Sequence, residues 1–181
     1  MLKVRIRGLA IDQTNTPVVI LETEKSDRGF GIWIGRFEAE SLALAVSGKE
    51  LPRPLTYDLL LNCLTSLNAT IEKAIIHSIE EDVYHASLYL TKENGETLTI
   101  DARPSDCLVL AVKSSFPIYV EEEVFEQSAI DLQKLGEDYP GQTTKKGNNE
   151  EFKQFIENIQ VEDFKRYLRR KDDDDSDEDK V

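Results

Sequence analysis

The sequence predicts an α+β fold: a hairpin-rich sheet of mixed or antiparallel strands with helices packed on it. Alternating apolar residues, short apolar runs and turn signals follow one another in the order βββα and then αβββαβ. The regular βαβ alternation of a doubly wound fold does not occur, and the 181 residues contain neither a GxGxxG nor a GxxxxGK phosphate-binding loop. The pattern therefore points away from the common nucleotide-binding folds.

The first half of the pattern consists of a hairpin, a third strand and a helix. The apolar alternation at the N-terminus changes face around Gly8, which indicates a bulge. An apolar helix is expected from about Phe37 to Ser47, and Gly48 should end it because glycine readily takes the left-handed conformation. Polar turn residues separate the three strands expected here, at residues 2–11, 18–21 and 30–34.

The second half begins with a helix and continues with hairpins. Thr56 is expected to cap a helix that runs from about residue 57 to residue 67. The dipeptide Asn94-Gly95 is a strong signal for a tight hairpin turn. Further strands are expected at residues 69–79, 83–90, 96–100 and 118–120.

A strand, a polar turn and an apolar helix occupy residues 98–112. Pro104 suits the first turn of a helix because its fixed φ is helical and it needs no N–H partner. Ser105 and Asp106 are expected to accept hydrogen bonds from the first helical N–H groups. The following residues, 108–112, are all apolar, so this helix must be buried.

The same pattern occurs at residues 32–46 and overlays residues 98–112 without a gap, at an offset of 66. Both copies carry an acid near the start of the helix, Glu40 in the first and Asp106 in the second. Two amphipathic units can look alike because buried helices draw on few residue types. The gapless register favours an internal duplication of a strand–turn–helix unit.

The charge balance is strongly acidic, with a formal net charge of −13. Residues 171–181 hold seven acids and two lysines, so the rest of the chain still carries −8. This balance argues against a protein that coats nucleic acid through a general basic surface. A nuclease remains compatible with it, provided that a local basic or metal-loaded site binds the phosphate.

Neither a membrane span nor a signal peptide is expected. No apolar run approaches the roughly 20 residues of a membrane span, and the N-terminus alternates apolar and basic residues as a strand does. Cys63 and Cys107 lie in apolar helical contexts and are expected to be buried free thiols. These features predict a cytoplasmic protein that makes no contact with a membrane.

The chain is expected to have one folded domain and a C-terminal extension. Residues 1–127 form the α+β domain and residues 128–150 a polar linker. Residues 151–170 form an amphipathic helical segment that docks on the domain or on a second chain, so a homo-oligomer is expected. Residues 171–181 form an acidic disordered tail.

Two polar clusters could carry chemistry, and each has an arginine beside a proline and an acid at a helix start. They comprise Arg53, Thr56, Tyr57 and Asp58 in one, and Asp101, Arg103, Ser105 and Asp106 in the other. One interpretation is structural, with helix caps and ion pairs only. The other is a shared pocket in which the arginines bind phosphate oxygens and Glu40, Asp58, Asp101 and Asp106 hold a divalent cation such as Mg²⁺ or Mn²⁺.

The motifs resemble those of the bacterial and plant bifunctional nuclease domain. The resemblance rests on Ile32-Trp-Ile-Gly, Glu38-Ala-Glu-Ser-Leu-Ala-Leu-Ala, Arg53-Pro-Leu-Thr-Tyr-Asp-Leu, Asp101-Ala-Arg-Pro-Ser-Asp and Pro117-Ile-Tyr-Val, in that order. It covers about residues 2–127 and implies an α+β fold with nuclease activity towards DNA and RNA. The family commonly has a histidine where this chain has Tyr57, and tyrosine is a poor base at neutral pH.

We therefore expect a nuclease, a metal-assisted phosphodiesterase that acts on nucleic acid. The roles expected from the motifs are phosphate or substrate binding by Arg53, Arg103, Thr56 and Ser105, catalysis by Asp58, Asp106 and Glu40, and metal binding by Asp58, Asp106 and Asp101. The alternatives are a non-catalytic module that binds an anion or a protein, and a structural subunit of an oligomer.

Overall fold

Eight strands form one mixed sheet in the order β6-β5-β4-β7-β1-β2-β3-β8. The computed structural model describes residues 1–132, except residues 13, 25, 26 and 50. All of these residues belong to one unit, which spans Met1–Gly147. The predicted linker beyond residue 132, the amphipathic segment 151–170 and the acidic tail 171–181 lie outside the described residues.

The first three strands form an antiparallel meander: β1 (Leu2–Ile11), β2 (Pro17–Thr23) and β3 (Arg28–Trp33). The register of β1 against β2 shifts between Ile6 and Gly8, which confirms the predicted bulge. Helix α1 (Arg36–Ser47) follows, and Gly48 ends it in the left-handed conformation with φ +62°. The predicted helix end at this glycine is therefore confirmed.

A second antiparallel meander consists of β4 (Ala69–Glu80), β5 (Val83–Lys92) and β6 (Thr97–Ala102). Glu81 and Asp82 connect β4 to β5 with positive φ at both positions, as a tight hairpin turn requires. Gly95, with φ +81°, turns the chain into β6. Helix α3 (Pro104–Ser114) follows directly and leads into β7 (Ile118–Val120).

Strand β7 joins the two meanders into one sheet. It pairs parallel to β4 and antiparallel to β1, so three residues near the end of the domain occupy the middle of the sheet. Each half of the molecule consequently has the same order of three antiparallel strands and a helix. Corresponding elements begin 66 to 69 residues apart: Leu2 and Ala69, Pro17 and Val83, Arg28 and Thr97, Arg36 and Pro104. This repeated topology supports the predicted duplication.

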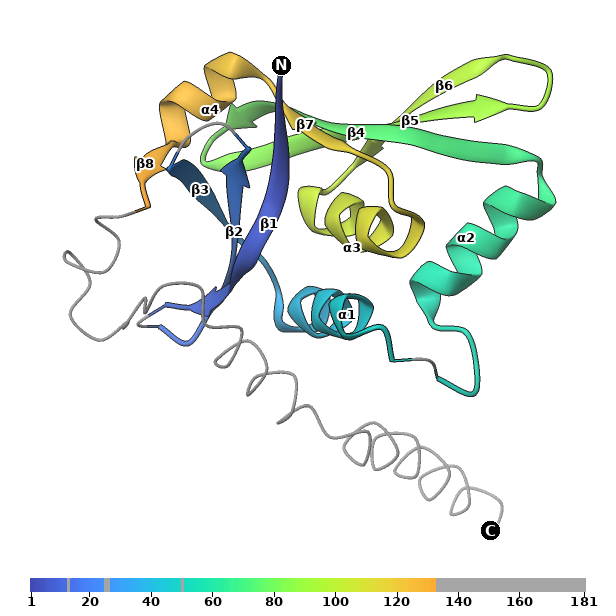
Figure 1. Cartoon of the computed structure of the whole chain (residues 1–181), viewed down its shortest axis with the longest axis horizontal. Helices are drawn as coiled ribbons and strands as arrows, with labels where there is room; N and C mark the ends of the chain where they lie inside the picture. Colours follow the sequence, from blue (N-terminus) through green and yellow to red (C-terminus); the bar gives the residue numbers. More distant parts are fainter. Residues whose placement is uncertain (13, 25–26, 50, 133–181) are drawn as a thin grey trace, which may run out of the picture. The chain divides into compact units, whose positions relative to one another are not determined.

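Helix α3 is the buried centre of the domain. Its residues from Cys107 to Ala111 are all buried, and it packs against β4, β5 and β7 as well as α1 and α2. Figure 1 shows α1, α2 (Thr56–Ser66) and α3 on the same side of β4 and β5, with α3 between the sheet and α1. An all-apolar helix can only be stable when it is covered in this way.

The sheet curls so strongly that its two ends approach each other. Phe30 on β3 stacks on Tyr84 on β5 at a ring-centroid distance of 5.7 Å, although four strands separate β3 from β5 in the sheet. Phe125 of helix α4 (Glu122–Ser128) packs edge-on against Phe30 at 6.0 Å. Strand β8 (Ile130–Asp131) then pairs with β3. An aromatic cluster therefore closes the curled end of the sheet.

The structure confirms the predicted α+β class and the seven strands and three helices that the sequence indicated, with ends shifted by a few residues. Helix α4 and strand β8 were not predicted. Thr56 is not the N-cap of α2; the cap position is Leu55, and Thr56 is the first helical residue. Cys63 is exposed, contrary to the prediction, whereas Cys107 is buried as predicted.

Within the described part of the chain, no helix has both the length and the apolar composition needed to span a membrane.

Truncation of Leu108 on α3 should destabilise the domain severely. Leu108 is fully buried, with 0% of its surface exposed, so Leu108→Ala leaves a cavity and should lower the free energy of unfolding by about 2–5 kcal/mol. The matched control is Leu59→Ala on α2, where the leucine is 58% exposed and the change should stay within about 0.5 kcal/mol. Urea unfolding measures both, and equal effects would contradict the burial of α3.

Candidate functional site

The first turns of three helices meet at one arginine. Arg103 is the N-cap residue of α3, and Asp106 lies in the first turn of the same helix. Glu38 comes from the first turn of α1, and Tyr57 is the second residue of α2. We call these four residues the Arg103 cluster.

Arg103 donates three hydrogen bonds to two carboxylates. Its Nε and Nη2 bond Oδ2 and Oδ1 of Asp106 at 2.8 and 3.1 Å, which is a bidentate pair. Its Nη1 bonds Oε1 of Glu38 at 2.7 Å. These bonds raise the pKa of Arg103, with the Asp106 bond as the largest cause. The side chain stays 65% exposed, so the guanidinium is held in place and open to solvent at the same time.

Tyr57 supports the cluster from the other side of Asp106. Its hydroxyl donates a hydrogen bond of 2.7 Å to Asp106 Oδ1. Burial, and after it this hydrogen bond, raises the pKa of Tyr57 well above its ordinary value. Tyr57 is therefore a permanent donor at neutral pH and cannot act as the base that a histidine at this position could supply.

The first turn of α3 is built differently from the prediction. No side chain caps its N-terminus, and Pro104 at the first helical position removes one of the N–H groups that a cap would satisfy. Asp106 turns towards Arg103 and Tyr57, and Ser105 is buried. The expected capping by Ser105 and Asp106 is therefore wrong, because ion pairing competes for the same carboxylate.

Asp58 has a separate set of partners. Its Oδ2 accepts a hydrogen bond of 2.9 Å from the backbone N–H of Leu55, which satisfies the start of α2. Its Oδ1 accepts from Nζ of Lys113 near the end of α3, and this bond is the main reason why the pKa of Asp58 is lowered. Asp58 thus ties α2 to α3.

The cluster contains Tyr57, Arg103 and Asp106 from the two predicted polar clusters, and only the last two were assigned a role from the motifs. Arg53 is exposed in the segment before α2, Thr56 is exposed at the start of that helix, and Asp101 is exposed on β6. Glu40 is half-buried on α1. Among the described residues, no hydrogen bond or ion pair links these four, or Ser105 and Asp58, to the Arg103 cluster.

Glu38 was missed because the sequence overlay aligned the wrong acid. The gapless offset matches Glu40 to Asp106. Counted from the first residue of each helix, however, Glu38 is third in α1 and Asp106 is third in α3. Aligning the two helix starts, Arg36 with Pro104, would have identified Glu38.

The described carboxylates do not form a ready metal site. They include no group of three or more His, Cys, Asp or Glu side chains that could hold a metal ion. Both oxygens of Asp106 and one of Glu38 already accept hydrogen bonds from within the cluster, and both oxygens of Asp58 are bonded elsewhere. The set Asp58, Asp106 and Asp101 therefore does not fit a divalent cation in this arrangement.

A nucleophilic thiol or a histidine dyad is not supported either. Burial raises the pKa of the Cys107 thiol to about 12, so it stays protonated at neutral pH. His77 Nε2 lies 3.1 Å from Ser87 Oγ on the neighbouring strand, away from the helices. The chemistry of the site therefore depends on an arginine, carboxylates and a tyrosine hydroxyl.

Comparison with known protein families identifies the domain. The family model described as the bifunctional nuclease domain matches residues 19–133, which is more than half of the chain. This chain belongs to the bifunctional nuclease domain family. The matched region includes α1, α2 and α3, and with them all four residues of the Arg103 cluster.

This bifunctional nuclease domain is similar in sequence to two groups of proteins. An uncharacterized protein of Mycobacterium tuberculosis is 32% identical over 164 residues, which cover 90% of this chain and 98% of that protein. Bifunctional nuclease 2 of Oryza sativa subsp. japonica is 26% identical over 117 residues, covering 63% of this chain and 36% of the rice protein. The bifunctional nuclease of Oryza minuta is 25% identical over 122 residues, with coverages of 66% and 37%.

Removing Lys113 should make the stability of the domain less dependent on acid pH. Because the pKa of Asp58 is lowered in the folded state, the pair stabilises the fold above the unfolded-state pKa near 3.8 and loses this effect as the pH falls through the folded-state pKa. Lys113→Met should therefore lower the free energy of unfolding at pH 7, by roughly 1 kcal/mol or less since solvent screens the pair.

Urea unfolding at pH 7, 5 and 3 measures this effect, and the difference from wild type should shrink towards pH 3. In an Asp58→Asn background the Lys113→Met change should have no pH-dependent effect. A difference that is as large at pH 3 as at pH 7 would mean that only packing of the lysine stem was lost.

Proposed function

We propose that this domain is a nuclease that hydrolyses phosphodiester bonds of DNA or RNA at the Arg103 cluster. Membership of the bifunctional nuclease domain family supports a nuclease-related role. The observation that supports this location is the guanidinium of Arg103, which is exposed but fixed by two carboxylates at the meeting point of three helix N-termini. Fixed, exposed arginines are well suited to bind phosphate.

Arg103 keeps donors for a phosphate even while it is paired. A guanidinium has five N–H groups, and the bonds to Asp106 and Glu38 use one each on Nε, Nη1 and Nη2. One N–H on each of Nη1 and Nη2 is left. A phosphate oxygen can therefore bind Arg103 without breaking the ion pairs that hold it.

Phosphate binding at the Arg103 cluster requires a further cation, because the net charge of the cluster is negative. Arg103, Asp106 and Glu38 together carry −1, which disfavours the approach of a phosphate. Arg53, exposed on the segment that leads into α2, is proposed as the second phosphate-binding arginine. Dependence on Mg²⁺ or Mn²⁺ was expected from the sequence and stays a prediction. The described carboxylates do not assemble a metal site that would support it.

Asp106 is proposed to orient the attacking water. Arg103 and Tyr57 together donate two hydrogen bonds to Oδ1 and one to Oδ2, so the one lone pair that remains, on Oδ2, has a fixed direction. Tyr57 is assigned a positioning role. Asp58 and Glu40, predicted as catalytic from the sequence, are not part of this cluster, and Asp58 is proposed to stabilise the packing of α2 on α3.

One observation favours a different function, a non-catalytic module that binds an anion or a protein. The acids of the cluster are ion-paired with Arg103, as expected where their role is structural. In that case the same N–H groups of Arg103 would recognise an anionic ligand without cleaving it. The two functions differ in one result, which is the appearance of shortened nucleic acid.

A cytoplasmic location and a homo-oligomer complete the proposal. Both are expectations from the sequence, and the oligomer depends on residues 151–170. Static light scattering of the full chain at several concentrations measures the mass. A monomeric mass throughout would remove the oligomer from the proposal.

Replacing Arg103 should strongly reduce cleavage without unfolding the protein. Highly purified protein is incubated with labelled single-stranded and double-stranded DNA and RNA, with Mg²⁺, Mn²⁺ or EDTA. Arg103→Ala should reduce the cleavage rate on the order of 100-fold or more, because the phosphate loses its fixed donors. The Arg53→Ala, Arg103→Ala double variant should retain no activity.

The matched control is Arg28→Ala. Arg28 is also bidentate to a carboxylate, with Nη1 and Nη2 each 3.0 Å from the oxygens of Glu126, but it lies at the α4 end of the sheet. This variant should keep full activity. Equal cleavage by wild type and the double variant would place the activity elsewhere or in a contaminant, and no cleavage by wild type would favour the binding module.

A further inference from the structure

The sheet has one face covered by helices and one face that they leave open. Side chains alternate along each strand, and most of the buried ones, such as Val4, Leu21, Ala74 and Leu88, point to the same face. Helix α3 packs on that face against β4, β5 and β7. We call the opposite side the outer face. Helices α1, α2 and α3 lie on the other side of β4 and β5, and α4 contacts β3 and β4 at one end of the sheet (Figure 1).

Three basic residues of β1 lie on the outer face. Arg5 is opposite Glu22 in the register, and its Nε and Nη2 bond Glu22 Oε1 at 2.9 and 2.8 Å. The bulge places Arg7 beside it, and Nη1 of Arg7 bonds the other oxygen of the same carboxylate at 2.7 Å. Lys3 pairs with Glu24 at 3.2 Å. Two arginines thus share one acid, and their side chains remain exposed, by 66% and 43%.

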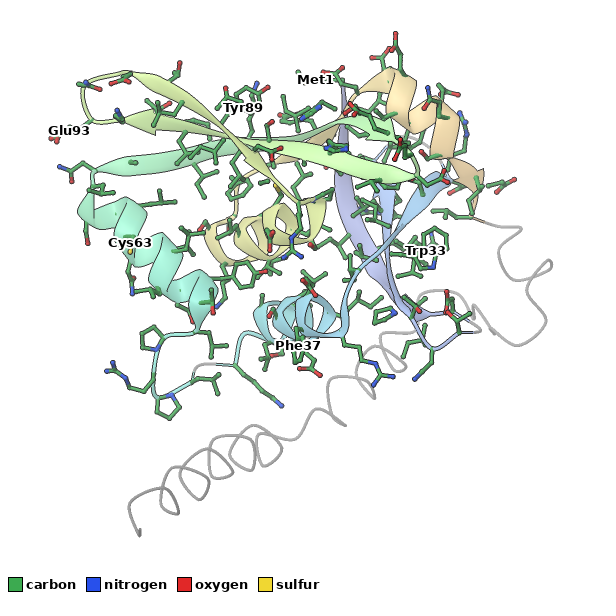
Figure 2. All side chains as sticks on the ribbon, turned by 180° about the vertical axis from the view of Figure 1, so that it is seen from behind. Met1, Trp33, Phe37, Cys63, Tyr89 and Glu93 are labelled. Carbon is green, nitrogen blue, oxygen red and sulfur yellow. The ribbon has the colours of Figure 1, made fainter. Side chains whose placement is uncertain are left out.

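Two tyrosines and a lysine continue this surface across the sheet. Tyr119 on β7 lies opposite Lys3 on one side and Ile75 on the other. Lys73 alternates with Ile75 along β4 and faces Tyr89 on β5, where its Nζ lies 4.9 Å from the ring centroid. Figure 2 shows Tyr89 on the side of the strands away from α1 and its Phe37.

The charge of the outer face differs from that of the whole chain. Two acids, Glu22 and Glu24, pair with three of its four basic side chains, which are Lys3, Arg5, Arg7 and Lys73. Asp101 follows on the edge strand β6. With Glu72, which is exposed beside Lys73 at the β4 bulge, four acids balance the four basic side chains. In a chain of net charge −13, a balanced surface beside two aromatic rings is less acidic than the average surface.

We propose that the outer face binds single-stranded nucleic acid. Tyr89 and Tyr119 stack on bases, and Lys3, Arg5, Arg7 and Lys73 contact the phosphates. Aromatic rings interleaved with cations on an open surface bind unpaired bases and backbone together. A duplex hides its base faces and loses the stacking contribution. The inference rests on the proposed function in that the bound strand is its substrate.

The edge strand β6 connects this surface to the Arg103 cluster. Tyr89 pairs with Thr99 on β6, and β6 pairs with no strand but β5 among the described residues. Arg103 follows β6 directly, after Ala102. A strand of nucleic acid held on the outer face therefore reaches the cluster by passing over one sheet edge. The docking surface and the cluster are distinct sets of residues and can be altered separately.

Fluorescence anisotropy with a labelled oligothymidylate tests the proposal on the full chain, in EDTA, with the oligonucleotide checked for integrity on a denaturing gel. Tyr89→Ala and Tyr119→Ala should each weaken binding about 5-fold or more. Arg5→Gln with Arg7→Gln should weaken binding and flatten the dependence of log K on log salt by about 0.7 for each phosphate that the protein no longer neutralises.

Phe37→Ala is the matched aromatic control, because Phe37 is 78% exposed but lies on α1. Lys92→Gln is the matched charge control, since Lys92 pairs with Glu96 in the β5–β6 hairpin. Both variants should bind as wild type. Circular dichroism and urea unfolding of every variant identify any that fail to fold, and Tyr89→Leu replaces Tyr89→Ala in that event.

The outcomes separate this inference from the proposed function. Arg103→Ala should still bind the oligonucleotide, whether or not it cleaves it. Binding that is lost in Arg103→Ala but unchanged in the outer-face variants would overturn the inference and leave the nuclease intact. Equal affinity for a duplex, or equal competition by polyglutamate, would also overturn it, the latter showing a general anion or acidic-protein surface. Wild-type cleavage without measurable binding would overturn it as well.

Discussion

Burial of helix α3 is the constraint on which the rest of the domain depends. The middle of α3, from Cys107 to Val112, is apolar on every side and cannot face water, so the sheet must cover it on one side and α1 and α2 on the others. That packing brings three helix N-termini together. Arg103 and Asp106 are placed by the start of α3 itself, whereas Glu38 and Tyr57 arrive because their helices must cover it. The polar cluster is thus a consequence of how the core is enclosed.

Local sequence patterns predicted the elements that depend on interactions between residues close together in the sequence. Period-two alternation located the strands, the Gly8 bulge and the hairpin at Asn94-Gly95, and an apolar run located α3. Helix α4 was not predicted because only two of its seven residues, Val124 and Phe125, are buried, which is too few for a periodic pattern. Phe125 packs against Phe30, a residue far away in the sequence. Glu38 was missed as a partner of Arg103 for the same reason, because the intervening sequence does not record which acids the arginine will meet. Tyr57 was among the candidate residues, but its hydrogen bond to Asp106 was not singled out.

The charge of two local surfaces differs from the net charge of the whole chain, and this difference matters for binding a polyanion. A chain of −13 contains a cluster of −1 around an exposed arginine and a sheet face on which basic side chains balance the acids. Interactions between exposed charges fade beyond about 8–10 Å at physiological salt, so a polyanion responds to the surface it touches rather than to the total. Two of the four acids predicted as metal ligands, Asp58 and Asp106, are paired with a lysine and an arginine in the fold.

The central position of β7 means that the sheet can be completed only after most of the domain has been synthesised. Residues 118–120 separate β1 from β4 in the sheet, yet ribosomes synthesise β1 first and β7 more than a hundred residues later. Throughout that interval the nascent first meander exposes the unpaired edge of β1, which is a template for wrong pairing. The alternating lysine and arginines on β1 supply the charges that keep such an edge soluble. Lys3, Arg5 and Arg7, which are proposed to bind nucleic acid in the folded protein, thus also protect the nascent chain from wrong strand pairing.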